Sequence, residues 1–104
     1  MEDLEKCLIG SWWHSHEEDT PEARIYRPAD YPFPPSRGRI GYEFRANGTL
    51  TYYGIAAADG SEEFSGRWTT EGASTVRITV DNERIRPMVL DVVSCEEDRF
   101  MVRR

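Results

Sequence analysis

The sequence has few of the residues that most often carry catalysis or bind metals. Its 104 residues include only two histidines and two cysteines. It contains no Gly-x-Ser-x-Gly segment, which would present a nucleophilic serine, and no closely spaced cysteine pair of the kind that binds zinc. His14 and His16 have metal-ligand spacing along one strand face, but a third ligand would have to come from Glu17, Glu18 or a distant carboxylate. The sequence therefore predicts no catalytic residue, no metal site and no cofactor.

Long apolar runs and an excess of positive charge are also missing. No segment approaches the roughly 18 apolar residues that a membrane-spanning helix needs, and the chain starts with the acidic residues Glu2, Asp3 and Glu5. A secretory signal begins with basic residues and an apolar stretch, so we expect a cytoplasmic protein without a membrane partner. The net charge of −6 disfavours nucleic acid as a partner.

The two cysteines lie far apart, at Cys7 and Cys95. In a cytoplasmic protein we expect both to be free thiols that pack as small hydrophobic side chains. The alternative is a disulfide that ties the N-terminal segment to a late strand.

Period-two alternation of apolar and polar residues dominates the rest of the chain. In the segment 39–45, for example, Ile40, Tyr42 and Phe44 face one side, and Asn47-Gly48 follows as a strong hairpin signal. The strands expected on this basis are 11–17, 39–45, 49–56, 63–70, 75–80, 88–95 and 99–103. Short turns between these strands indicate an antiparallel sheet whose sequential strands pair.

We expect this sheet to close into an up-and-down β-barrel of about seven or eight strands, because closure removes exposed edges. A two-sheet β-sandwich is the alternative. The apolar spacing of Leu4 and Leu8 predicts a short helix over residues 1–9, ended by Gly10. Residues 1–104 are expected to form a single all-β domain.

One stretch breaks the pattern of short turns. Residues 18–38 hold five of the six prolines and read as a long proline-rich loop, with a short edge strand at 23–26 as an option. Loops of this length in a small domain are usually functional or pack as a lid.

A resemblance follows from the two ends of the chain. Gly10-Ser11-Trp12 opens the first strand after a short helix, and the last strand ends in Arg103 and Arg104. The chain resembles the lipocalins of the calycin superfamily, and in size the small bacterial lipocalin-like domains. The resemblance implies a barrel that binds a small ligand. It also implies that Arg103 or Arg104 packs across the ring of Trp12.

Several residues are candidates for contact with such a ligand. Tyr42, Tyr52 and Trp68 share the inward phase and could line a cavity, although the same phase is typical of core packing. Four arginines flank the proline-rich loop and could bind a carboxylate or phosphate at the barrel mouth: Arg24, Arg27, Arg37 and Arg39. The alternative is that these arginines pair with the acidic residues 17–19. His14, which lies within the expected strand 11–17, completes the set.

The sequence thus predicts a binding protein for a small, partly apolar and anionic ligand. The alternative is a protein–protein interaction or inhibitor module that uses the aromatic and proline residues 31–35. A small enzyme that uses His14 or His16 as acid or base is a third hypothesis. Apolar residues on both faces of 88–95 would also allow a homodimer.

Overall fold

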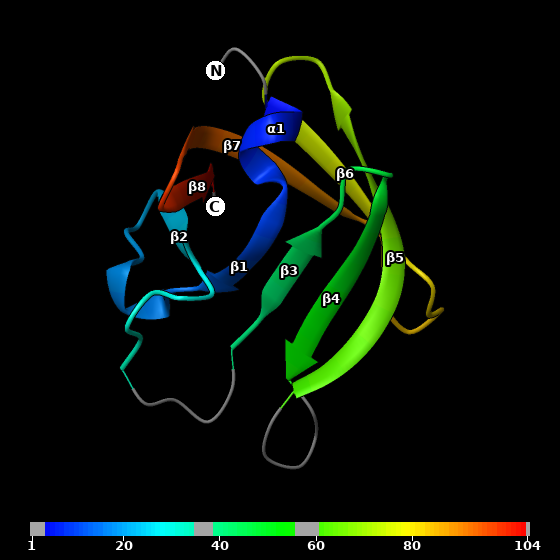
Figure 1. Cartoon of the computed structure of the whole chain (residues 1–104), viewed down its shortest axis with the longest axis horizontal. Helices are drawn as coiled ribbons and strands as arrows, with labels where there is room; N and C mark the ends of the chain where they lie inside the picture. The colour runs from blue at the N-terminus through cyan, green and yellow to red at the C-terminus, as the bar shows by residue number, and fades with distance from the viewer. Residues whose placement is uncertain (1–3, 35–38, 56–60, 104) are drawn as a thin grey trace.

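Eight antiparallel strands close into a barrel in the computed structural model, which describes residues 4–34, 39–55 and 61–103 (Figure 1). The predicted all-β barrel with a short N-terminal helix is therefore confirmed, and the two-sheet sandwich does not form. The elements are α1 (Leu4–Leu8), β1 (Gly10–His14), the 3₁₀ helix η1 (His16–Glu18), β2 (Ala23–Pro28), β3 (Gly41–Phe44), β4 (Thr49–Ile55), β5 (Ser61–Glu71), β6 (Thr75–Val80), β7 (Met88–Glu96) and β8 (Arg99–Arg103).

The order of strands around the barrel is sequential from β3 to β8, and each of these strands pairs with the next. The hairpin of β1 and β2 fills the remaining gap in reverse order, with β1 beside β3 and β2 beside β8. A tight turn would have forced β2 to pair with β3. The connection over residues 29–40 is long enough to let β3 pair with β1 instead.

Local sequence explains the strands and turns. In β6, Val76, Ile78 and Val80 are buried and the residues between them are exposed, as the alternation predicts. The hairpin predicted at Asn47-Gly48 is present: Gly48 has a φ of +87°, and the Asn47 side chain accepts a hydrogen bond from the backbone N–H of Thr49 at 3.1 Å.

Two strand glycines permit close approaches that a side chain would prevent. A Cβ atom at Gly66 would collide with the backbone carbonyl of Thr79 on the neighbouring strand β6. A Cβ atom at Gly41 would lie 2.7 Å from the ring of Trp13, which packs across this glycine on the outside of the barrel and reaches Tyr53 at 4.8 Å between ring centroids. Both strand glycines therefore mark places of close packing, a common role of glycine inside strands.

The middle of the barrel is filled by aromatic rings. Phe100 is completely buried and stacks on Tyr26 at 4.6 Å between centroids. The Trp12 ring meets Phe100 edge-on at 4.9 Å, and Phe44 lies 6.5 Å from Phe100. Offset and edge-on contacts of this kind add to the stabilisation from buried apolar area.

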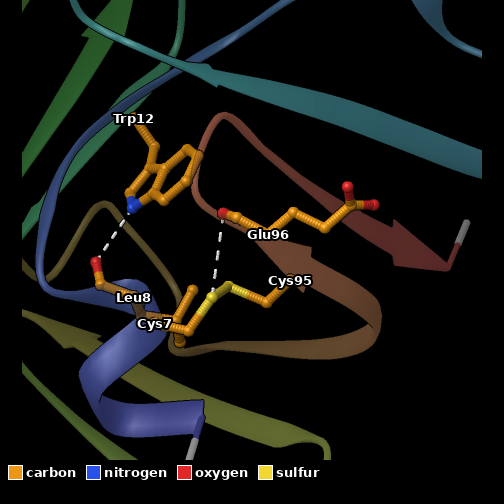
Figure 2. The surroundings of a disulfide bond; sticks show 5 residues. All are labelled: Cys7, Leu8, Trp12, Cys95 and Glu96. Atoms are coloured by element: carbon orange, nitrogen blue, oxygen red, sulfur yellow. Dashed lines mark hydrogen bonds between the residues drawn. A yellow bond between two sulfur atoms is a disulfide. The ribbon is translucent and has the colours of Figure 1, made fainter.

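Helix α1 covers one end of the barrel and buries Leu4 and Leu8 in the core (Figure 1). The indole N–H of Trp12 donates a 2.9 Å hydrogen bond to the carbonyl of Leu8, which fixes the last turn of the helix. A disulfide joins Cys7 to Cys95 of β7, where the Cα atoms are 6.3 Å apart (Figure 2). The expectation of free thiols was wrong, because the docking of α1 beside the end of β7 brings together two cysteines 88 residues apart.

The stretch 18–38 is more ordered than a single loop. It includes the end of η1 and all of β2, while residues 35–38 lie outside the described part of the chain. The expected short strand at 23–26 is present and extends to Pro28, but it pairs with β1 on one side and β8 on the other and is not the edge strand that was expected. Among the described residues, no helix has the length and apolar character to cross a membrane.

Candidate functional site

A row of five side-chain rings lies inside the barrel, one from each of five adjacent strands. His14, Tyr26, Tyr42, Tyr52 and Phe64 come from β1, β2, β3, β4 and β5. Successive ring centroids are 5.3 Å apart from His14 to Tyr26, 5.7 Å to Tyr42, 5.6 Å to Tyr52 and 6.1 Å to Phe64. Three of these contacts join residues that are direct cross-strand partners. We call this set the ring row.

The ring row lies toward the end of the barrel away from α1, which we call the distal end. At this end β1 finishes at His14 and β3 begins at Gly41. Tyr26 and Tyr42 are buried, whereas His14, Tyr52 and Phe64 are half-buried. The deeper rings therefore form a floor, and the half-buried rings at its edges are partly open to solvent.

Burial keeps the phenols of the ring row neutral. It raises the pKa of Tyr42 well above its ordinary value of 10.0, and the neighbouring phenols of Tyr26 and Tyr52 add to the effect. Burial also raises the pKa of Tyr26 and of Tyr52. At neutral pH the three hydroxyls are therefore hydrogen-bond donors rather than anions. The Tyr42 hydroxyl lies 3.7 Å from the thioether sulfur of Met88, to which it donates.

Arg24 supplies a positive charge beside these hydroxyls. It lies two residues before Tyr26 on β2 and therefore on the same face of that strand. Its guanidinium acts on both Tyr26 and Tyr42 and partly offsets the rise in their pKa. Within the described residues Arg24 forms no ion pair with a carboxylate, unlike Arg27 and Arg39.

His14 is held at the edge of the ring row by Asp19. Its Nε2 atom lies 2.8 Å and 3.1 Å from the two carboxylate oxygens of Asp19. Asp19 also accepts a 2.9 Å hydrogen bond from the backbone N–H of Ile25, so the carboxylate that orients the imidazole is itself fixed. No group of three metal-ligating side chains occurs among the residues that the structure describes.

Arg39 is committed to the outside of the barrel. Its guanidinium donates two hydrogen bonds to the carboxylate of Glu17, at 2.8 Å and 2.7 Å, and further bonds to the carbonyls of His14 and Pro34. It also lies 4.7 Å from the ring centroid of Phe33. The hydrogen bonds from Arg39 lower the pKa of Glu17 to about 2.

Arg27, on β2, makes the corresponding contacts with the other glutamate of η1. It forks onto Glu18 with distances of 2.9 Å and 2.7 Å and lies 4.9 Å from the ring centroid of Tyr31. Tyr31 and Phe33 are both half-buried and meet edge-on at 4.9 Å. These two arginines therefore join the glutamates of η1 to the segment 31–34. The alternative that the arginines pair with the acidic residues 17–19 is confirmed for Arg27 and Arg39.

The other predicted residues lie apart from the ring row. Trp68 packs toward the α1 end, where its indole N–H donates to the carbonyl of Arg45 at 2.9 Å and its ring meets Phe44 at 5.1 Å. Arg37 lies outside the described residues. The structure thus brings together the rings of His14, Tyr42 and Tyr52. It does not bring Trp68 to them, and Arg39 reaches only the backbone carbonyl of His14.

The arginine contact implied by the lipocalin resemblance is wrong for Arg103. Its side chain is 64% exposed and bonds to Asp91 at 3.0 Å, because Arg103 alternates with the inward residues Phe100 and Val102. Phe100 occupies the place beside Trp12 instead. Arg104 lies outside the described residues. Gly10 has a φ of +131° where α1 gives way to β1, a conformation that favours glycine.

The sequence names Arg24 only as one of four arginines that flank the proline-rich loop, and Tyr26 was missed as a site residue. Both lie in a stretch whose prolines favour a loop, which hides the phase that they share. Their spacing of two residues within an extended segment was the available signal. Comparison of the chain with protein-family models, with curated proteins and with solved structures finds no match.

Proposed function

We propose that this chain binds a small molecule at the distal end of the barrel, with a planar apolar body and one carboxylate or similar oxyanion. The ring row carries the proposal. Its five rings form one continuous layer, with half-buried edges that a ligand could contact. Because the rings touch one another, the ligand would rest on them and would not enter a deep cavity.

The chemistry of the distal end matches such a ligand. Aromatic faces offer large contact area to a planar body. Arg24 and the neutral Tyr52 hydroxyl offer a charged and an uncharged donor to an oxyanion. Asp19 and Glu62, which lies two residues before Phe64 on β5, place negative charge nearby. These carboxylates disfavour ligands with several negative charges.

Two neighbouring tyrosines of β4 provide a test variant and a matched control. The Tyr52 ring belongs to the ring row inside the barrel, whereas the Tyr53 ring faces outward. The Tyr53 hydroxyl donates to Glu43 at 3.1 Å on the outside of the barrel. With 1-naphthoate as probe, we expect saturable shifts of backbone amide NMR signals in the ring row. Tyr52→Phe should weaken binding by about threefold to tenfold, as loss of a neutral hydrogen bond predicts. Tyr53→Phe should leave the affinity unchanged.

Arg24→Gln tests the charged half of the proposal. Loss of a charge-assisted hydrogen bond should weaken 1-naphthoate binding by about tenfold or more. Arg103→Gln, at an exposed position on the outside of β8, is the control. Equal affinities for Arg24→Gln and the unmodified chain, or amide shifts confined to the outside of the barrel, would contradict the proposed function. Native mass spectrometry of freshly purified protein would identify a co-purified ligand.

A further inference from the structure

The outer faces of β5 and β6 carry an alternating array of arginine and threonine. Arg67 is the direct cross-strand partner of Thr79, and Thr69 is the partner of Arg77. All four side chains are exposed, and the two arginines stand diagonally across the strand pair. These residues point away from the barrel interior, so none of them belongs to the ring row.

A hollow of about 260 Å³ lies over this array, and Gly48 and Trp68 complete its lining. A second hollow of about 100 Å³ shares Gly48, Trp68 and Thr69 with the first and continues to Ile9, which is 44% exposed. The shared residues make the two hollows neighbours. Together they run from the arginine array toward the apolar side chain of Ile9 at the α1 end.

The charges in these hollows are unequally compensated. Arg77 forms an ion pair with Glu71, with 2.7 Å between Nε and the carboxylate oxygen. Glu5, in the smaller hollow, accepts a 3.0 Å hydrogen bond from the Thr70 hydroxyl. Within the described part of the chain, Arg67 has no ion pair. The guanidinium of Arg67 therefore lies beside a partly apolar hollow, and no carboxylate among the described residues forms an ion pair with it.

The geometry points to a second binding site here, for an organic anion with a single sulfonate or carboxylate on a small apolar body. Arg67 binds the anionic group and the Thr79 hydroxyl donates to it, while the apolar body lies over Gly48 toward Ile9. The hollow is slightly smaller than typical ligand pockets, which begin near roughly 300 Å³, so the molecule is of fragment size. This site does not depend on the proposed function of the distal end.

The probe for this site is 1-naphthalenesulfonate, whose sulfonate stays ionised at every accessible pH. Titration into the full chain should shift the amide NMR signals of Gly48, Thr69 and Thr79 in a saturable manner. Arg67→Gln should weaken binding about tenfold, because a charge-assisted contact is lost. Glu71→Gln should tighten binding by about threefold, because Arg77 is released from its ion pair to face the ligand.

Two controls separate this site from general charge effects and from the ring row. Arg103→Gln removes an exposed arginine from β8 and should leave the affinity read from the amides of Gly48, Thr69 and Thr79 unchanged. Tyr52→Phe alters the ring row, and the affinity read from these same three amides should also stay unchanged. The neutral analogue 1-naphthylmethanol should bind at least about tenfold more weakly. Shifts confined to ring-row amides, an unchanged affinity for Arg67→Gln, or equal binding of the neutral analogue would each overturn the inference.

Discussion

The bidentate pair of Arg27 and Glu18 couples the stability of the barrel to pH. The hydrogen bonds from Arg27 lower the pKa of the Glu18 carboxyl from 4.5 to about 2. A carboxyl whose pKa is depressed by folding stabilises the protein above its unfolded pKa. This contribution is complete above about pH 4.5 and is lost as the pH falls toward 2. The Glu18 side chain is 30% exposed, so solvent screening limits the contribution to about 1–2 kcal/mol.

We predict that Glu18→Gln lowers the free energy of unfolding at pH 7 by about 1–2 kcal/mol. The difference from the unmodified chain should shrink as the pH falls to 2, because Glu18 is then protonated in the unfolded state and about half protonated in the folded state. Urea denaturation at a series of pH values measures both quantities. Glu97→Gln, at an exposed turn, serves as the control. A difference between Glu18→Gln and the unmodified chain that stays constant from pH 7 to pH 2 would contradict this account.

At the scale of residues, the sequence predicted the direction in which a side chain points better than its position along the barrel. Tyr42, Tyr52 and Trp68 all face inward, as their phase indicates. Alternation carries no information on which end of the barrel each residue approaches. Trp68 lies near the α1 end, whereas Tyr42 and Tyr52 lie near the distal end. Arg39 was predicted at the mouth because only its neighbours in sequence were known, whereas its partner Glu17 is 22 residues away.

At the scale of elements, α1 depends on its attachments for stability. A helix of five residues is too short to be stable in isolation. It is held by the burial of Leu4 and Leu8, by the hydrogen bond from Trp12 and by the Cys7–Cys95 disulfide (Figure 2). The disulfide closes most of the chain into one loop, so cross-linking restricts the unfolded state strongly.

We predict that reduction of this disulfide lowers the free energy of unfolding by about 2–4 kcal/mol. Urea denaturation with and without dithiothreitol measures the change, and intact mass under non-reducing conditions reports the oxidation state. A variant with both Cys7→Ser and Cys95→Ser should resemble the reduced protein and ignore the reductant. Disulfides persist in oxidising compartments and are rare in the cytosol. Two free thiols in the folded protein, with no effect of reductant, would favour the cytoplasmic expectation instead.

Most elements were predictable because their signals are local. The Asn47-Gly48 hairpin and the alternating β6 follow from residues adjacent in sequence. The 3₁₀ helix η1 was not predicted, and the strand expected over residues 11–17 ends at His14. A single 3₁₀ turn has little sequence signature of its own. Here Glu17 and Glu18 are held by arginines from β2 and from the segment before β3, which are distant partners.

At the scale of the whole molecule, closure of the barrel was predictable but its strand order was not. Alternating strands with short turns favour a closed sheet whatever the order of the first two strands. The order depends on the β1–β3 and β2–β8 ladders, which join residues distant in sequence. Neither ladder has a local signal, and the resemblance to lipocalins gave no register.

These two ladders decide whether the barrel opens locally or only as a whole. The hairpin of β1 and β2 is paired on both sides, and its inward rings contact Phe100 and Tyr42. Since no strand of the closed sheet has a free edge, separating β1 from β3 would expose these rings together with the hydrogen bonds of the ladder.

We predict that the free energies of opening measured for hydrogen-bonded amides of β1 and β2 lie within about 1 kcal/mol of those in β5 and β6. Native-state hydrogen exchange measured by NMR tests this, with exposed turn amides near Glu97 as the fast-exchanging reference. Markedly faster exchange in β1 and β2 would show that the hairpin opens as a separate unit. His14 and Tyr26 of the ring row would then lie on a locally opening part of the barrel.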